Sequence, residues 1–382
     1  MDCCANRPIC QILAEDRTWR IETSSDDSPS DSTSSSAELP NDSNAHIPTP
    51  DNATSEDKPR SAEPPPPAYS GKATPPRPST PPPKLSIRGH TDRVYCASFS
   101  RDGKYIVSGS DSDVRIWDVQ TGNSVLGPLK TIGTAWCVAF SPDGRRIAAG
   151  LGDNTILIWN AVTGETVGTL KGHTSPVLCV DFSPDGTKLV SGSYDRTIWI
   201  WHAELGRGKF GPIEGHTDYV RSVVFSGDGK RIASCSHKEM MVTNAKSGDL
   251  LWKASPETIP NWIAFSPDAQ TVVSVERSST VLVWNADKGT RVERDTECIP
   301  AVRFTSSAGS NYSSALSPDG RWRADKMGNT GNGVRIFDLQ TGEAVDAYQH
   351  PDYVCSIAFS PDSKRVLSAS YDKTIQVYTP EC

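Results

Sequence analysis

The sequence predicts an all-β protein: a closed seven-bladed β-propeller with four antiparallel strands per blade, preceded by a disordered Pro/Ser-rich tail. Two observations support this prediction. A turn of the form S-P-D-G, with single substitutions in some copies, recurs seven times, starting at positions 100, 141, 183, 226, 266, 317 and 360. A Trp or a substitute for it follows each turn, and these positions are 42, 42, 42, 41, 53 and 41 residues apart. A fixed period of this size is typical of a repeat architecture.

One repeat shows how the pattern becomes a blade. Val177–Phe182 predicts a strand, and Ser183–Gly186 predicts a turn in which Pro fixes φ and Asp-Gly supplies the reversal. Lys188–Ser193 and Thr197–Trp201 predict two further strands, the last one rich in β-branched and aromatic residues. With a fourth, outer strand before the next Gly-His, the repeat has the strands of a propeller blade.

Composition divides the chain into two domains. Residues 1–83 hold 16 of the 29 prolines and carry 13 Asp and Glu against 7 Lys and Arg, a net charge of −6 out of −7 for the whole chain. A segment of low hydrophobicity buries too little surface to offset the entropy of ordering, so we predict that this acidic tail is disordered. Residues 84–382 are nearly neutral and long enough for one large core, and we predict that they form the propeller.

Composition also disfavours several classes of protein. The chain has no run of about 18 apolar residues that would predict a membrane span, and its first residues lack the apolar stretch of a secretory signal. Cys96, Cys137 and Cys179 recur at one place in successive repeats, which indicates small buried side chains rather than disulfides or metal ligands. We therefore expect an intracellular protein, cytoplasmic or nuclear, with no metal and no cofactor.

The recurring residues resemble the WD-repeat family over residues 84–382, because Gly-His, the S-P-D-G turn, Asp-x-Thr and a final Trp-Asp recur in this order. In that family a His, a Ser or Thr, an Asp and the Trp form a buried hydrogen-bonded set in each blade. The resemblance places this structural network at His90, Ser108, Asp111 and Trp117 in the first repeat, at His173, Ser191, Asp195 and Trp201 in the third, and at His350, Ser368, Asp372 and Tyr378 in the seventh. A Ser-His-Asp catalytic interpretation is disfavoured, since an enzyme does not need the same set three times, whereas a satisfied polar network rigidifies each blade.

Other repeats depart from this pattern. The second repeat has Thr131 where the His is expected. The fourth keeps His216 and Ser234 but has His237 at the place of the Asp and ends in Thr243. The fifth and sixth repeats also depart from it, so we expect blades four to six to be the least rigid part of the ring.

The ring is expected to close by an exchanged strand. The last repeat stops after its third strand, and Lys84–Arg88, just before the first Gly-His, can supply the missing outer strand of the last blade. The family closes its ring in this way, and closure removes exposed strand edges.

In this family the wider contact surface often lies on the top of the ring, at positions three and five past the Gly-His and just before the structural Asp. Carried over position by position, the candidates are Arg93, Tyr95, Trp136, Leu178, Tyr194, Tyr219, Arg221, Asn261, Arg277, Tyr312, Tyr353 and Tyr371. Tyr, Trp and Arg dominate interface energetics, although aromatic residues can also simply fill the rim. Three Arg and no acid in this set favour an acidic or phosphorylated peptide as the partner.

The tail contains a second candidate motif. Pro66, Pro67 and Tyr69 form a P-P-x-Y motif, which is pre-extended as polyproline II and presents an aromatic side chain that suits WW domains. WW-bearing ubiquitin ligases read this motif. The tail is therefore a candidate docking segment for a WW-domain protein.

These features predict a non-catalytic scaffold or adaptor that binds protein or peptide partners on the top face, with the tail as a second docking segment. The alternatives are a substrate adaptor for a WW-domain ubiquitin ligase acting through Pro66–Tyr69, a propeller hydrolase, and a subunit of a nucleic-acid-associated complex. The sequence has no P-loop and no H-E-x-x-H motif, which disfavours an enzyme. The nearly neutral propeller offers little counterion release, which disfavours direct binding of nucleic acid.

Overall fold

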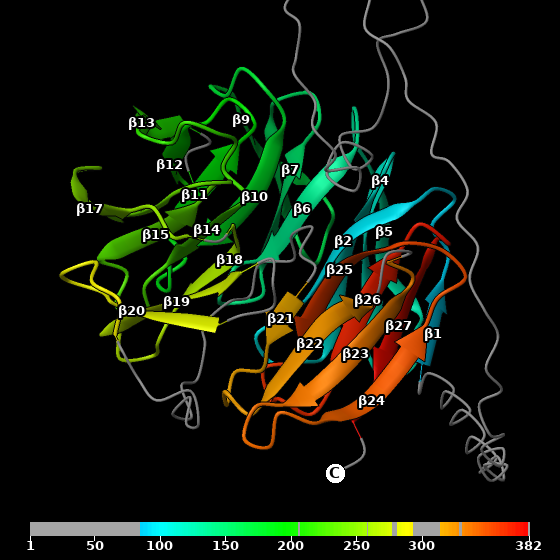
Figure 1. Ribbon diagram of the computed structural model, residues 1–382. Coiled ribbons are helices and arrows are strands. Elements are labelled where there is room, and N and C mark those ends of the chain that lie inside the picture. The colour runs from blue at the N-terminus through cyan, green and yellow to red at the C-terminus, as the bar shows by residue number, and fades with distance from the viewer. Residues whose placement is uncertain are drawn as a thin grey trace, which may run out of the picture. The chain divides into compact units, whose positions relative to one another are not determined.

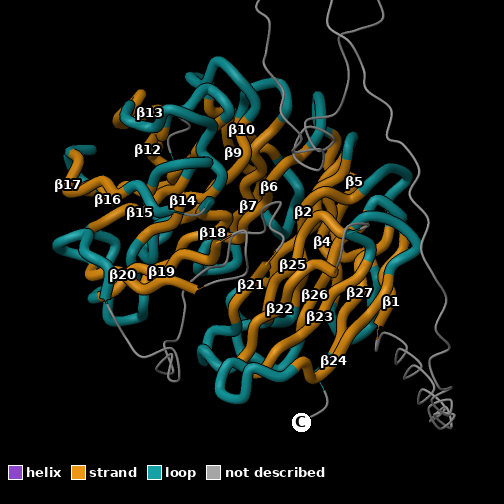
Figure 2. Tube along the Cα trace, viewed as in Figure 1, coloured by secondary structure: helices purple, strands orange, loops and turns teal. Residues whose placement is uncertain are grey.

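The computed structural model describes residues 85–204, 207–257, 259–276, 281–292, 314–327 and 331–380. These residues form seven antiparallel β-sheets, which confirms the predicted all-β, seven-bladed propeller (Figure 1). The described part consists of strands joined by loops and turns (Figure 2). The innermost strands contact one another in the cyclic order β2, β6, β10, β14, β18, β21, β25 and back to β2, so the ring is closed.

The first three blades follow one another along the chain. Blade 1 consists of β2 (Val94–Phe99), β3 (Tyr105–Ser110), β4 (Asp113–Asp118) and β5 (Ser124–Lys130). Blade 2 consists of β6 (Ala135–Phe140), β7 (Arg146–Leu151), β8 (Ile156–Asn160) and β9 (Thr166–Leu170). Blade 3 consists of β10 (Val177–Phe182), β11 (Lys188–Ser193), β12 (Ile198–His202) and β13 (Arg207–Ile213).

The next three blades repeat this order. Blade 4 consists of β14 (Ser222–Phe225), β15 (Arg231–Cys235), β16 (Met240–Asn244) and β17 (Leu250–Ala254). Blade 5 has three described strands, β18 (Pro260–Phe265), β19 (Thr271–Glu276) and β20 (Val281–Asn285). Blade 6 consists of β21 (Ser314–Leu316), β22 (Trp322–Met327), β23 (Gly333–Asp338) and β24 (Ala344–Gln349).

Blade 7 closes the ring as the sequence predicts. It combines β25 (Val354–Phe359), β26 (Val366–Ser370) and β27 (Thr374–Tyr378) with β1 (Leu85–Arg88) from the other end of the propeller. β1 pairs antiparallel with β27, with Leu85 opposite Val377, and the two strands lie side by side at the outer edge in Figure 1. The predicted exchange therefore joins the first and last parts of the propeller through a β-ladder.

Burial falls from the axis of the ring to its rim. All six residues of β2, β6 and β10 are buried, whereas every residue of the outer strand β5 is at least partly exposed. The hydrophobic clusters of the core each join two neighbouring blades; one of them packs Val138 and Phe140 of blade 2 against Val107 and Ile116 of blade 1. The core is thus a ring of interfaces between blades.

The S-P-D-G turns are held by their own side chains. In blade 3, Ser183 donates to Asp185 over 2.6 Å and accepts a hydrogen bond from Lys188 N over 2.9 Å. Gly186 adopts a φ of 69°, in the left-handed region that favours glycine. Blades 5 and 7 place Ala269 and Ser363 in the same conformation, with φ of 55° and 60°, which is less favourable for residues with a Cβ. The turn geometry is therefore kept even where the glycine is lost.

The recurring cysteines are small buried side chains, as the sequence predicts, and they form part of the contacts between blades. Cys96, Cys137 and Cys179 are buried thiols, and Cys96 Sγ lies 3.2 Å from Ala135 O of the next blade. A Cβ on Gly150 would lie 2.6 Å from Cys137 Sγ and 2.7 Å from a methyl group of Val177 in blade 3, so glycine is required there for the blades to approach closely.

Candidate functional site

Each blade presents two edges. In blade 3 the inner strand begins where Val177 pairs with Ser193 and ends where Phe182 pairs with Leu189. We call the edge at the start of the inner strands the top face; it carries the loop before each inner strand and the loop between the second and third strands. We call the opposite edge, which carries the S-P-D-G turns, the turn face.

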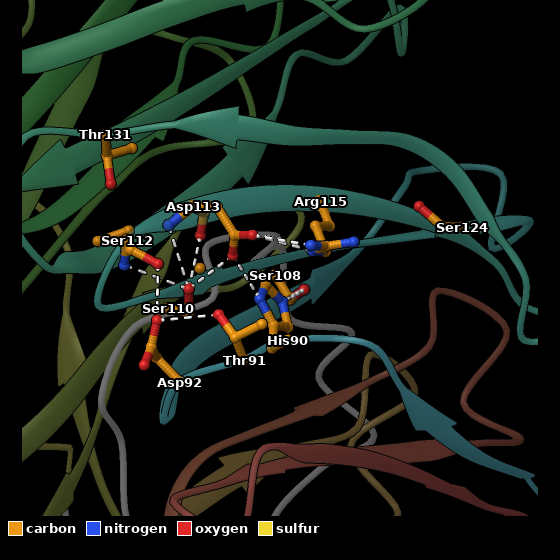
Figure 3. Close-up of polar contacts among 12 residues, drawn as sticks. His90, Thr91, Asp92, Ser108, Ser110, Ser112, Asp113, Arg115, Ser124 and Thr131 are labelled. Atoms are coloured by element: carbon orange, nitrogen blue, oxygen red, sulfur yellow. Dashed lines mark hydrogen bonds and ion pairs between the residues drawn. The ribbon is translucent and has the colours of Figure 1, made fainter.

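The buried network of blade 1 contains a different carboxylate from the one predicted. Figure 3 shows the His90 ring between Ser108 and Asp113, and its two nitrogens lie 2.6 Å from Ser108 Oγ and 2.6 Å from Asp113 Oδ1. Trp117 Nε1 donates to Ser108 Oγ over 2.7 Å. Asp113 also pairs with Arg115 over 3.0 Å. The prediction of Asp111 as the network acid is wrong, and Asp113 takes this place.

The reason lies in the length of one loop. Ser191 and Trp201 of blade 3 are ten residues apart, whereas Ser108 and Trp117 of blade 1 are nine residues apart. Counted back from the Trp, Asp113 therefore stands where blade 3 has Thr197, and this position points toward the His. Asp111 stands on the top face instead, where it accepts hydrogen bonds from Thr134 Oγ1 over 2.9 Å and from the Tyr95 hydroxyl over 3.4 Å.

The network of blade 3 agrees with the prediction. His173 lies 2.8 Å from Asp195 and 2.7 Å from Ser191, and Trp201 Nε1 donates to Ser191 Oγ over 2.8 Å. Thr197 Oγ1 donates to Asp195 over 2.6 Å. The predicted set is therefore brought together in full.

Blade 7 keeps the polar part of this network. His350 lies 3.0 Å from Asp372 and 2.7 Å from Ser368. Tyr378, which replaces the Trp, is 2% exposed and stacks on Tyr348 of blade 6, with ring centroids 3.4 Å apart. The aromatic member thus packs against the neighbouring blade.

These networks are sealed structural units. Burial alone would raise the pKa of Asp195, but hydrogen bonds from His173 and Thr197 outweigh it and hold the pKa well below the usual range of a carboxyl. His173 and Ser191 are buried, so no substrate reaches the Ser-His pair. Three copies of a paired, charge-assisted set stabilise the blades and offer no open nucleophile.

Aromatic and cationic side chains gather at two places on the top face. The first, which we call the Tyr371 cluster, spans blades 6, 7 and 1. The Tyr371 ring contacts Tyr95 and Tyr353, with centroids 5.2 and 5.5 Å away, and carries the Arg93 guanidinium 4.9 Å above it. The Lys326 ammonium lies 3.8 Å from the centroid of Tyr353. Two cations thus lie against a continuous aromatic surface.

The second group, which we call the Arg221 cluster, joins blades 3, 4 and 5. Tyr194 and Tyr219 stack with centroids 5.0 Å apart and planes at 9°, and the Arg221 guanidinium lies 4.8 Å over Tyr219. Arg221 donates to Asn261 Oδ1 over 3.2 Å and lies 3.3 Å from His237 Nδ1. These contacts fix the guanidinium plane while leaving the side chain half-buried at the surface.

Comparison with known proteins agrees with this geometry. A family model described as the IFT122 first beta-propeller matches residues 134–381, more than half of the chain. A second model, described as WD domain, G-beta repeat, matches residues 82–118. The chain belongs to the WD-repeat β-propeller family.

Relatives of this WD-repeat propeller match it over short stretches. An uncharacterized WD repeat-containing protein of Synechocystis is 39% identical over 67 residues, which cover 17% of this chain and 19% of that protein. WD repeat-containing protein 55 of Pongo abelii is 31% identical over 119 residues, 30% of this chain and 28% of that protein. The Ribosome biogenesis protein BOP1 homolog of Drosophila grimshawi is 42% identical over 62 residues, 16% of this chain and 8% of that protein. The chain thus spans less than a third of the length of each of these relatives.

The candidate partner-binding residues of this WD-repeat propeller are not equally accessible. Arg93 is exposed, and Tyr194, Tyr219, Arg221, Asn261, Tyr353 and Tyr371 are half-buried. Tyr95, Trp136 and Leu178 are only 1%, 3% and 6% exposed. They therefore support the top face from below: Tyr95 packs edge-to-face against Trp136, with centroids 5.1 Å apart. Arg277 and Tyr312 lie outside the described residues, as do Pro66, Pro67 and Tyr69 of the tail.

Sequence reasoning missed three residues of the top face. Asp111 adds an acid to a set that was expected to have none, while Lys326 and His237 complete the two clusters. His237 was assigned to the network of blade 4, but Glu239 is the carboxylate near His216 there, 3.8 Å away. The loop lengths between the second and third strands would have been the sequence signal for Asp111. Lys326 follows no recurring pattern and has no such signal.

Within the described residues there is no group of three or more His, Cys, Asp or Glu side chains placed to hold a metal ion. The same part of the chain contains no helix long and apolar enough to cross a membrane.

Proposed function

We propose that the protein is a non-catalytic scaffold that binds a protein partner on the top face of the propeller, through a segment that carries an anionic side chain. Propellers of this family generally bind protein partners. The observation that carries the proposal is the pair of cation–aromatic clusters, which lie on the same face and present Arg93, Lys326 and Arg221 against Tyr rings. Asp111 is engaged by Thr134 and Tyr95 at the surface between blades 1 and 2.

The geometry of the Arg221 cluster explains why an anion fits. Tyr219 and Asn261 hold the guanidinium in one orientation, so part of the entropy cost of binding is already met. A planar, oriented guanidinium recognises a carboxylate or a phosphate through two parallel hydrogen bonds. The stacked Tyr194–Tyr219 pair next to it offers a rigid apolar platform for a neighbouring side chain.

The proposal is tested by affinity purification from cells with the intact chain and with a Tyr219→Ala, Arg221→Ala double variant. Hot-spot residues cost about 2 kcal/mol or more each when truncated, so we expect the captured proteins, apart from WW-domain proteins bound by the tail, to fall to background. Arg145→Ala, at an exposed Arg on the turn face, is the matched control that removes one positive charge elsewhere. The variants are first compared by thermal unfolding with the parent.

Phosphatase treatment of the extract separates the two sources of negative charge. Loss of binding after treatment assigns a phosphorylated segment, and unchanged binding assigns an acidic one. If the double variant melts like the parent and captures the same proteins, the top face is not the binding surface, and the proposal fails.

The tail is proposed as a second docking segment. Pro66, Pro67 and Tyr69 form the P-P-x-Y motif that WW domains read, which would let this chain act as a substrate adaptor for a WW-domain ubiquitin ligase. Tyr69→Ala should abolish capture of WW-domain proteins and leave the partners of the top face bound. Ribosome biogenesis, named in one group of relatives, is not carried over, because the match covers 8% of that protein.

A further inference from the structure

The turn face contains a cavity that the proposed function does not use. It has a volume of about 360 Å³ and is lined by residues from all seven blades, so it lies on the axis of the ring. Its walls include five phenylalanines that end inner strands, Phe99, Phe140, Phe182, Phe225 and Phe359. Its rim includes five prolines of the S-P-D-G turns, Pro142, Pro184, Pro267, Pro318 and Pro361. The cavity is apolar and within the size range of small-ligand sites, about 300–1,000 Å³.

One buried carboxylate breaks the apolar lining. Asp181 lies on β10 and is 5% exposed. The residues at the same position of the other six inner strands, each preceding the last residue of its strand, are uncharged: Ser98, Ala139, Val224, Ala264, Ala315 and Ala358. The ring therefore carries a single charge at this level, and that charge lines the cavity.

Asp181 has a hydrogen-bond donor but forms no ion pair with the described residues. Its Oδ2 accepts a hydrogen bond from Phe225 N of blade 4 over 2.9 Å. Burial raises the pKa of Asp181 to about 7, and the backbone hydrogen bonds from Phe225 and Phe182 only partly offset this. The other titratable or charged groups nearby are Cys179 on the same strand, whose buried thiol has a raised pKa, and Arg101 at the rim. A cation on a bound partner protein would stabilise the ionised carboxylate in such a buried site.

We propose that this cavity binds an arginine side chain of a partner protein, whose aliphatic stem lies against the phenylalanine walls and whose guanidinium pairs with Asp181. Charge complementarity supports this occupant, because Asp181 is the acid among the lining residues. Arginine buries an apolar stem while keeping its charge at the tip, and its guanidinium is more weakly hydrated than an ammonium. Arg101, exposed at the rim in the place of a turn proline, is a like charge that weakens the binding of the inserted arginine.

The hydrogen bond to Phe225 does not by itself require a carboxylate. It ties blade 3 to blade 4, but an asparagine side chain would accept the same N–H through its carbonyl oxygen. The other inner strands pack around the same ring with Ser, Ala or Val at this position. The charge at Asp181 is therefore not needed to close the ring.

The test measures binding of acetyl-Leu-Arg-Leu-amide to the full chain by isothermal titration calorimetry, against the same peptide with citrulline, which has the shape of arginine without its charge. We expect citrulline to bind about tenfold or more weakly, since removing one member of a buried charge pair leaves the other unpaired. Asp181→Asn should weaken the arginine peptide by a similar factor and remove the preference over citrulline. Glu165→Gln, an exposed acid on the turn face of blade 2, is the control and should leave binding unchanged.

Two further measurements keep the proposal testable if Asp181→Asn fails to fold. Arg101→Gln removes a cation from the rim and should tighten the arginine peptide several-fold at low salt. Affinity of the parent should rise about tenfold from pH 6 to pH 8, because Asp181 must lose a proton with a pKa of about 7 to pair with the guanidinium.

The contrary outcomes are equally defined. Equal affinity for the arginine and citrulline peptides would assign the cavity to an apolar occupant and overturn the proposal. A flat pH profile together with unchanged binding in Arg101→Gln would do the same. Loss of stability in Asp181→Asn without any peptide binding by the parent would reduce Asp181 to a structural tie between blades 3 and 4.

Discussion

Blades 3 and 4 are neighbours with the same strand order, but different residues surround the histidine that recurs in both. In blade 3 a carboxylate bonds directly to the histidine, as Asp195 lies 2.8 Å from His173. In blade 4 the nearest carboxylate, Glu239, lies 3.8 Å from His216 and instead bonds to Lys253 over 2.8 Å. His216 Nδ1 is buried and has no hydrogen-bond partner among the described residues. The same histidine position is thus fully paired in one blade and half paired in the next.

The two blades also differ at the position of the repeat's final Trp, where blade 4 again has a polar atom without a hydrogen-bond partner among the described residues. Trp201 fills the core of blade 3 and donates to Ser191, whereas Thr243 stands at this place in blade 4. The Thr243 hydroxyl is buried and has no hydrogen-bond partner among the described residues. Both blades nevertheless keep four strands in the same order. The repeated network therefore adds stability to a blade whose shape is already set by strand pairing and by packing between blades.

The largest expected effect comes from the aromatic position. Trp201→Ala should lower the free energy of unfolding by about 4 kcal/mol, because it removes a buried side chain and leaves a cavity. Thr243→Val, which removes the unpaired hydroxyl at nearly constant volume, should be neutral or stabilise by about 1 kcal/mol. Urea unfolding followed by tryptophan fluorescence and circular dichroism measures both changes.

The comparison predicts that Trp201→Ala lowers the free energy of unfolding and that Thr243→Val does not. A destabilising Thr243→Val would mean that the hydroxyl is paired and that blade 4 has a network of its own. A loss of less than about 1 kcal/mol in Trp201→Ala would mean that neighbouring side chains collapse into the space, so the Trp adds little.

Neutralising the carboxylate near the histidine should also cost blade 3 more stability than blade 4, by a smaller amount. Asp195→Asn should cost about 2–3 kcal/mol, because a charged acceptor that serves His173, Thr174 and Thr197 is lost. Glu239→Gln should cost about 1 kcal/mol, since Gln still accepts from Thr217 N and loses mainly the partly exposed pair with Lys253. Equal costs in the same unfolding experiment would show that Glu239 has fully replaced the Asp.

The residues that could be predicted from the sequence are those with a recurring spacing. The S-P-D-G turns and the spacing of the Trp positions predicted the number of blades. Lys84–Arg88 was predicted as the closing strand, and the structure pairs Leu85–Arg88 with the last strand. These features depend on local turn chemistry and on strand pairing. The complete network of blade 3 was predictable for the same reason. The resemblance to the WD-repeat family, which rests on the same spacing, agrees with the family models that match residues 134–381 and 82–118.

The residues that were predicted wrongly depend on loop length. Asp111 and Asp113 are two residues apart, and a loop one residue shorter decides which of them meets His90. Exposure was likewise not readable, because Tyr95 and Trp136 occupy the same position of the repeat as the half-buried Arg221 and yet are covered by their neighbours. The cavity around Asp181 depends on seven strands meeting at one axis, a relation that no single repeat contains.

The smallest expected effect is a dependence on pH that belongs to blade 4. Burial lowers the pKa of His216 to about 4, and Lys253 adds to this, while Glu239 only partly opposes it. A proton therefore binds the unfolded chain, with a histidine pKa near its usual value of about 6.5, before it binds the folded protein. Stability from this group is present above that value and is lost as the pH falls toward 4, by about 2 kcal/mol between pH 7 and pH 5. The difference in stability between the parent and His216→Gln should shrink by this amount over that range. Asp195 gives blade 3 no such loss between pH 7 and pH 5. The pKa of Asp195 is lowered, so its contribution to stability persists above the usual carboxyl range. A constant difference between the parent and His216→Gln from pH 7 to pH 5 would show that His216 is protonated in the folded protein and paired with Glu239.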